Sequence, residues 1–105
     1  TATPNNDSSE SKAFIKVFEG KVPPFSSTKA YTGHTLAACG GIEAVIAVLS
    51  IQNNVLFPNL NHTTPIEETG LIPVKQITRI ENVRNVLSNS FGFGGNNSSL
   101  IFSKL

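Results

Sequence analysis

Apolar residues recur at helical spacing in two segments of the chain, and the first lies near the start. Its stripe consists of Ala13, Phe14, Val17 and Phe18. Asp7 and Glu10, just before it, match the reciprocal capping pattern that opens many helices. Gly20 lies where a C-terminal cap is expected. The pattern predicts a helix over residues 7–19.

The second helical stripe is longer and more apolar. It consists of Leu36, Ile42, Val45, Ile46 and Leu49. Alanines and a valine fill the remaining faces, which predicts a central helix over residues 34–52, buried on several sides. Gly40 and Gly41 inside it cost about 1 kcal/mol each relative to alanine. We expect close packing against a second backbone to explain them.

Shorter extended segments surround these helices. Prolines exclude helix before a brief buried strand expected at residues 25–28. Residues 53–76 are irregular, and strands are expected at 85–93 and 99–102. Gly92, Gly94, Gly95, Asn96 and Asn97 supply the turn chemistry of a hairpin. The order predicts an α/β layer with too few strands to close a core alone.

The low share of charged residues predicts that another part of the protein or a partner covers some of the surface. Charged residues are 14% of the 105 residues, whereas a free-standing domain carries about 25%. A net charge of +1 does not indicate binding to nucleic acid or an anionic membrane. No unbroken run of about 18 apolar residues predicts a membrane span. One cysteine fits a reducing cytoplasm, and the absence of methionine indicates a processed chain or a piece of a longer one.

Residues 29–43 concentrate the candidate chemistry. His34 at a helix start is either held by hydrogen bonds without a chemical duty or offers a neutral imidazole to a substrate carbonyl. Lys29 and Glu43 are either a solvated pair or partners, because a carboxylate on so apolar a helix needs a partner. In a regular helix, about 900° of rotation separates His34 from Glu43. We therefore do not expect Glu43 to orient His34 directly.

Three further features have modest interpretations. Cys39 stands among small residues and is interpreted as packing, because buried cysteines act as small hydrophobes more often than as nucleophiles. Residues 91–95 are either a hairpin turn or a loop whose backbone N–H groups hold an anion. His62 is interpreted as a solvated loop residue.

Three ordered motifs together resemble the β-ketoacyl-[acyl-carrier-protein] synthases. Residues 26–29 (SSTK) and 32–43 (TGHTLAACGGIE) are similar to the lysine–histidine motif of that family. Residues 89–97 (NSFGFGGNN) are similar to its C-terminal glycine loop, and residues 1–7 (TATPNND) to the tail of its histidine motif. The resemblance spans nearly the whole chain.

The resemblance implies a thiolase-like α/β fold, built from two similar halves, each with a sheet packed on helices. Residues 1–105 would be a partial C-terminal domain whose mixed sheet is incomplete. The family's cysteine nucleophile would lie in the N-terminal half, outside this chain. Its first catalytic histidine would lie just before Thr1, with one glycine between them.

The resemblance also implies roles for nine residues. His34 would donate a hydrogen bond to the thioester carbonyl of the malonyl group, and Lys29 and Glu43 would form a charge network near Asp7. The backbone N–H of Phe93 would be half of an oxyanion hole. Substrate contacts, including those with the phosphopantetheine arm, would come from Thr1, Thr3, Phe91 and Gly92.

The expected activity is decarboxylative condensation of an acyl group with malonyl carrier protein, in fatty acid or polyketide synthesis. Acyl carrier protein and the N-terminal half would be its partners, in a cytoplasmic homodimer without metal or other cofactor. The alternative is a non-catalytic partner subunit that lacks the nucleophile. A degradative thiolase is disfavoured because residues 91–97 contain no cysteine. The isolated chain is expected to be inactive.

Overall fold

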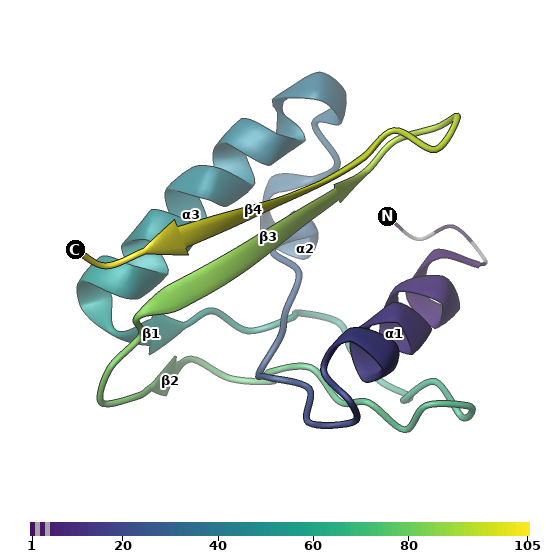
Figure 1. The fold of residues 1–105 in the computed structure, drawn as a ribbon, viewed down its shortest axis with the longest axis horizontal. Helices are drawn as coiled ribbons and strands as arrows, with labels where there is room; N and C mark the ends of the chain where they lie inside the picture. Colours follow the sequence, from purple (N-terminus) through teal and green to yellow (C-terminus); the bar gives the residue numbers. More distant parts are fainter. Residues whose placement is uncertain (2, 4) are drawn as a thin grey trace.

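The computed structural model describes residues 1, 3 and 5–105 (Figure 1). The elements are α1 (Asn6–Val17), α2 (Lys29–Thr32), the 3-10 helix η1 (Leu36–Ala38), α3 (Cys39–Asn53), β1 (Val55–Leu56), β2 (Thr78–Arg79), β3 (Asn85–Phe91) and β4 (Asn97–Ser103). The strands form two separate two-stranded antiparallel sheets, β1 with β2 and β3 with β4. Helix and sheet are both present, as predicted. The described residues do not form the predicted mixed sheet, because both strand pairs are antiparallel.

The predicted hairpin is confirmed. β3 and β4 pair from Asn85 with Ser103 to Phe91 with Asn97. The glycine-rich turn closes with the Gly92 N–H donating to the Asn96 carbonyl at 2.9 Å. Gly94 (φ 82°) adopts a left-handed conformation that a side chain would oppose. The turn chemistry read from the sequence therefore corresponds to the observed turn.

α3 lies along the β3–β4 hairpin (Figure 1) and packs against both strands. The buried apolar residues are Cys39, Ala47, Ile51, Val55 and Val83. The opposite side of α3 is also apolar but uncovered, with Val45 60% exposed and Leu49 40% exposed. The prediction of a helix buried on several sides is therefore wrong among the described residues, because the side that carries Val45 and Leu49 stays largely exposed.

The two glycines of α3 lie in different surroundings. A Cβ added to Gly40 would meet the Ser90 hydroxyl of β3 at 3.6 Å, an ordinary contact. A Cβ added to Gly41 would meet nothing within 4 Å among the described residues. The predicted close approach of a second backbone is therefore not observed at Gly41, and at Gly40 the neighbour is a side chain.

α1 begins and ends close to the predicted bounds but is capped differently. Its N-cap is Asn5 rather than Asp7, and no side chain caps the helix. At the C-terminal end the chain turns left-handed at Glu19 (φ 50°) and Gly20 (φ 80°). The Gly20 N–H donates to the Ile15 carbonyl, five residues earlier, at 2.9 Å, which is the wider of the two hydrogen bonds in a Schellman motif. Asp7 and Glu10 are thus free of the capping role that the sequence pattern predicted.

Residues 25–28 do not form the predicted buried strand. Phe25 makes one ladder-like bond, accepting from the Val74 N–H at 2.9 Å, and its ring packs edge-on against Phe14 of α1 at 5.6 Å. Two preceding prolines remove the N–H donors that a longer ladder would need. The segment is instead a connection held by its aromatic ring.

The long apolar helix predicted over residues 34–52 is divided. Gly33 (φ 73°) ends α2, His34 and Thr35 are non-helical, and the α-helix itself begins at Cys39. By length and composition alone, Leu36–Asn53 is apolar enough to cross a membrane, which the sequence reading did not anticipate. Its contacts with β3 and β4 are those of a helix that covers a sheet. Residues 53–76, predicted as irregular, contain the short strand β1, which pairs with β2.

Candidate functional site

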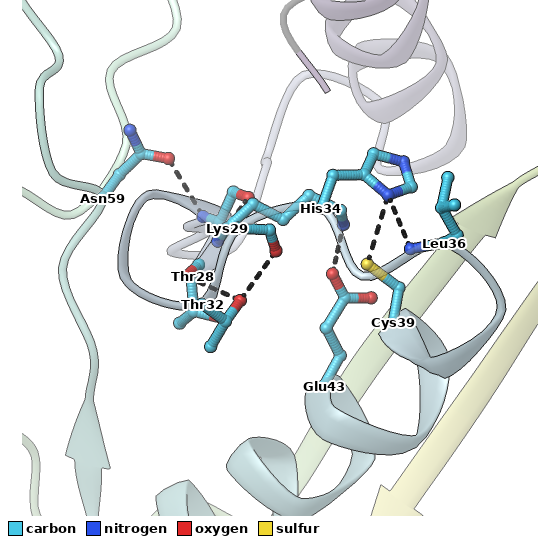
Figure 2. A network of polar contacts seen from close by, with 10 residues as sticks. Thr28, Lys29, Thr32, His34, Leu36, Cys39, Glu43 and Asn59 are labelled. Carbon is cyan, nitrogen blue, oxygen red and sulfur yellow. Dashed lines mark hydrogen bonds and ion pairs between the residues drawn. The ribbon is translucent and has the colours of Figure 1, made fainter.

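The site is assembled around a short connection between α2 and α3. α2 is a single turn, and its start is anchored by the Ser27 N–H, which donates to the Asn59 side-chain oxygen at 3.0 Å (Figure 2). The Thr32 hydroxyl donates to the Thr28 carbonyl at 3.4 Å across the same turn. Gly33 then adopts φ 73°, which only glycine does without strain. This sharp exit turns the following residue, His34, toward the beginning of α3.

The His34 ring is held through its Nδ1 atom. The backbone N–H of Leu36 donates to Nδ1 at 3.2 Å, and Leu36 itself has φ 53°, an unusual conformation for a branched side chain. Nδ1 therefore accepts a hydrogen bond and carries no proton. The neutral ring must have its proton on Nε2, which is then available to donate to another molecule.

Lys29 and Glu43 form an ion pair that joins α2 to the first turns of α3 (Figure 2). Their side chains are 22% and 17% exposed. The sequence left open whether these residues are partners or a solvated pair, and the structure brings them together. A mostly buried pair is shielded from solvent, which strengthens its attraction relative to a surface pair.

Glu43 does not contact His34, as expected, although the reason differs from the predicted one. The predicted separation required one regular helix from His34 onward, whereas α3 begins only at Cys39. The α3 side chain that contacts the His34 ring is instead that of Cys39, whose sulfur lies 3.6 Å from Nδ1 (Figure 2).

Glu10 belongs to the charged group around Lys29 and Glu43, although the sequence pattern predicted only a capping role for it. Burial and the nearby Asp7 carboxylate raise the pKa of Glu10, and the Lys29 ammonium opposes the rise. Asp7 and Glu10 are three residues apart on α1 and share one face, which is the signal that could have revealed Glu10. The structure thus gathers three carboxylates from two helices near one lysine.

The glycine turn presents Phe93 to solvent. Phe93 is 95% exposed, and a Cβ added to Gly92 would stand 3.0 Å from the Asn96 carbonyl. The sequence reading placed Phe91, Gly92 and Phe93 in one functional loop. In the described residues their backbone is kept compact by the Gly92 and Gly95 N–H groups, which bond within the turn.

One cleft of about 1060 Å³ receives most of the predicted residues. Those that line it are Thr1, Asp7, Lys29, His34, Glu43, Phe91 and Gly92, together with Glu10 and Cys39. Thr3 and Phe93 are not part of its lining. Thr3 instead uses its carbonyl to accept from the Asn6 N–H at 3.2 Å. Ala2 and Pro4, in the N-terminal motif, lie outside the described residues.

His62, predicted to be solvated, is partly buried. It lines the same cleft, and its Nδ1 atom is enclosed without a hydrogen-bond partner among the described residues. Among residues 1, 3 and 5–105, no group of three or more histidine, cysteine, aspartate or glutamate side chains is arranged to hold a metal ion.

Comparison with known proteins gives a consistent similarity. The family model described as "Beta-ketoacyl synthase, C-terminal domain" matches residues 1–63. The chain is 41% identical over 105 residues to 3-oxoacyl-[acyl-carrier-protein] synthase 1 of Haemophilus influenzae, covering 99% of this chain. It is 38% identical to the protein of the same name from Escherichia coli, and 41% identical to 3-oxoacyl-[acyl-carrier-protein] synthase 2 of Coxiella burnetii, covering 100% of this chain in both. In each case the chain spans only 26% of the relative's length.

Proposed function

Because the chain belongs to the β-ketoacyl synthase family, we propose that residues 1–105 are part of the C-terminal domain of a 3-oxoacyl-[acyl-carrier-protein] synthase. The complete protein would condense an acyl group with malonyl carrier protein. Its substrates would be carried on the phosphopantetheine arm of acyl carrier protein, without a metal or other cofactor. The names of the relatives favour a synthase over a non-catalytic partner subunit.

The observation that carries the proposal is the state of His34. Its Nδ1 accepts from the Leu36 N–H, which leaves the proton of the neutral ring on Nε2, and the residue lines the cleft of about 1060 Å³. When the bond between the malonyl carboxylate and its methylene carbon breaks, the electron pair passes onto the thioester as an enolate. The Nε2–H would stabilise that developing oxyanion. A single preorganised donor of this kind is worth about 3 kcal/mol.

The carbanion would then attack the acyl thioester held on the nucleophile, whose thiolate leaves. As the family resemblance implies, that nucleophile would lie outside residues 1–105, and the buried Cys39 is not proposed for that role. A charge network would hold α1, α2 and α3 together next to His34. Its members would be Lys29, Glu43, Glu10 and Asp7.

Thr1, which lines the cleft, would contact the phosphopantetheine arm. Thr3, which lies outside the lining, would contact the same arm. Phe91 and Gly92 would line the acyl pocket, and the exposed Phe93 would supply its backbone N–H to a second oxyanion hole and its ring as a gate. The support for this arrangement is that Thr1, Phe91 and Gly92 share one cleft with His34.

Exposed apolar side chains support a thiolase-like architecture in which two halves share a core. Val45 on α3 and Ile101 on β4 are 60% and 70% exposed, although both lie on regular elements. Strands and helices of the remaining protein would cover them, in a cytoplasmic homodimer.

The test is His34→Ala in the full-length protein. We expect malonyl decarboxylation to fall by about 10²–10³-fold, the loss typical of one oxyanion donor. Transfer of the acyl group to the nucleophile should be retained. An equal loss of both steps would show that His34 only supports the fold.

A further inference from the structure

Two polar groups converge on one atom of His34. The Leu36 N–H lies 3.2 Å from Nδ1, and the Cys39 sulfur lies 3.6 Å from the same atom (Figure 2). Cys39 is the first residue of α3 and is only 9% exposed. The sequence pattern assigned it to packing, so this polar contact is a property that only the structure reveals.

The position of the protons decides the direction of the second bond. Nδ1 already accepts from Leu36, and a proton on Nδ1 would collide with the Leu36 hydrogen. The contact with Cys39 therefore cannot run from the ring to the sulfur. A thiol has one hydrogen and is a weak donor, so the remaining arrangement is Cys39 S–H donating to Nδ1.

We propose that Cys39 is a positioning residue for His34, and that its thiol acts with the Leu36 N–H to keep Nδ1 unprotonated and Nε2 protonated. The proposal rests on the proposed function of His34 as the donor to the thioester carbonyl. Leu36 alone leaves the imidazole free to swing about its single hydrogen bond. The second donor comes from α3 and ties the ring to the helix that also bears Glu43.

Burial makes this contact persistent. Cys39 lies below the ring on a helix that packs against β3, and its neighbours on both sides are alanine and glycine. The chain thus offers no other polar side chain at positions 37–41 that could take over the bond. Alanine at position 39 would keep the helix and remove only the donor.

The experiment compares Cys39→Ala, Cys39→Ser and Ala47→Gly in the full-length synthase. Serine keeps a donor of similar size, and Ala47 is a buried residue of α3 without a contact to His34. Each variant is assayed for malonyl carrier protein decarboxylation. The nitrogen signals of ¹⁵N-histidine-labelled protein are recorded, with His34 assigned by its absence in His34→Gln.

We expect Cys39→Ala to slow decarboxylation by about three- to tenfold, the equivalent of one ordinary hydrogen bond. The Nδ1 signal should move away from the protonated range, because it loses a donor. Cys39→Ser should restore both, and Ala47→Gly should change neither. An unmoved Nδ1 signal in Cys39→Ala, or a serine variant as slow as the alanine variant, would overturn the proposal.

The same measurements separate this inference from the proposed function. If His34→Gln leaves decarboxylation intact, the proposed function fails, whatever Cys39 does. If His34→Gln abolishes it while Cys39→Ala leaves the rate and the Nδ1 signal unchanged, only the positioning role of Cys39 fails.

Discussion

Lys29 and Glu43, fourteen residues apart, form a mostly buried ion pair that fastens the single turn of α2 to α3. The pair lies next to the residue that carries the proposed chemistry. Between its two members the chain leaves α2 at Gly33, which has φ 73°, and enters α3 at Cys39. The ion pair therefore closes the loop that holds His34.

Removing one partner of this pair should be costly. Glu43→Gln leaves the Lys29 ammonium in a site that is only about a fifth exposed, so we expect a loss of about 1–3 kcal/mol, below the range for fully buried pairs because water still reaches the site. Urea unfolding of the full-length protein measures it. The matched control is Lys12→Gln, because the Lys12–Glu68 pair is 59% and 60% exposed. That variant should change stability much less than Glu43→Gln, because solvent screens the exposed pair. Equal losses from the two variants would contradict a special role for the inner pair.

Glu10 should make stability depend on pH in a defined direction. Its pKa is raised above 4.5, mainly by burial and then by Asp7. The folded protein therefore holds this proton more tightly than the unfolded chain. The associated stability is fully present below the unfolded pKa and is lost as pH rises through the folded pKa. Glu10→Gln should be more stable than the parent protein at neutral pH, and the difference should vanish in acid. Urea unfolding of the full-length protein between pH 4 and 8 checks it.

Glu68 is the control of opposite sign for that titration. The Lys12 ammonium and the Ser8 hydroxyl lower its pKa, so its contribution is present above the unfolded pKa and is lost as pH falls through the folded pKa. Glu68→Gln should therefore weaken the protein at neutral pH. A Glu10→Gln protein that is less stable than the parent at neutral pH would show that attraction to Lys29 outweighs burial.

Gly41 tests what covers α3 in the complete protein. A Cβ there meets nothing within 4 Å among the described residues, so Gly41→Ala should stabilise the helix by about 1 kcal/mol through backbone entropy. Gly94→Ala is the comparison, because φ 82° at that position opposes a side chain and predicts a loss of about 1–2 kcal/mol. Thermal unfolding of the two full-length variants measures both. A loss at Gly41 would mean that another part of the protein packs directly onto this glycine.

The isolated 105-residue chain should be poorly stable and inactive. Its apolar core is small, and large apolar side chains such as Val45 and Ile101 are exposed on regular elements. We expect it to self-associate, to bind a hydrophobic dye and to unfold without a sharp transition, while showing no decarboxylation of malonyl carrier protein. Light scattering after size exclusion and calorimetry measure these properties. A monomer with cooperative unfolding at high temperature would contradict the expectation.

Local signals were sufficient for several elements. The apolar stripe predicted α1, and the glycine and asparagine cluster predicted the β3–β4 turn, because both depend on backbone conformations that neighbouring residues determine. The motif around Lys29, His34 and Glu43 was sufficient for the family, and that assignment is confirmed by the comparisons. The pairing of Lys29 with Glu43 remained one of two possibilities until the fold brought α2 against α3.

Other features depended on contacts between distant segments. The sequence predicted only a capping role for Glu10, because its place among the charged groups depends on the approach of α1 to Lys29. The break of the long apolar segment before Cys39 also escaped detection, because its residues favour helix and the turn at Gly33 and Leu36 overrides that preference. The sequence by itself determined the family and the main elements, since these follow from local residue patterns, and it singled out His34 as the candidate for the chemistry. Only the tertiary structure decided which atoms surround its imidazole, because the turn at Gly33 and the start of α3 at Cys39 bring the Leu36 N–H and the Cys39 sulfur to Nδ1, and the residue pattern does not specify either.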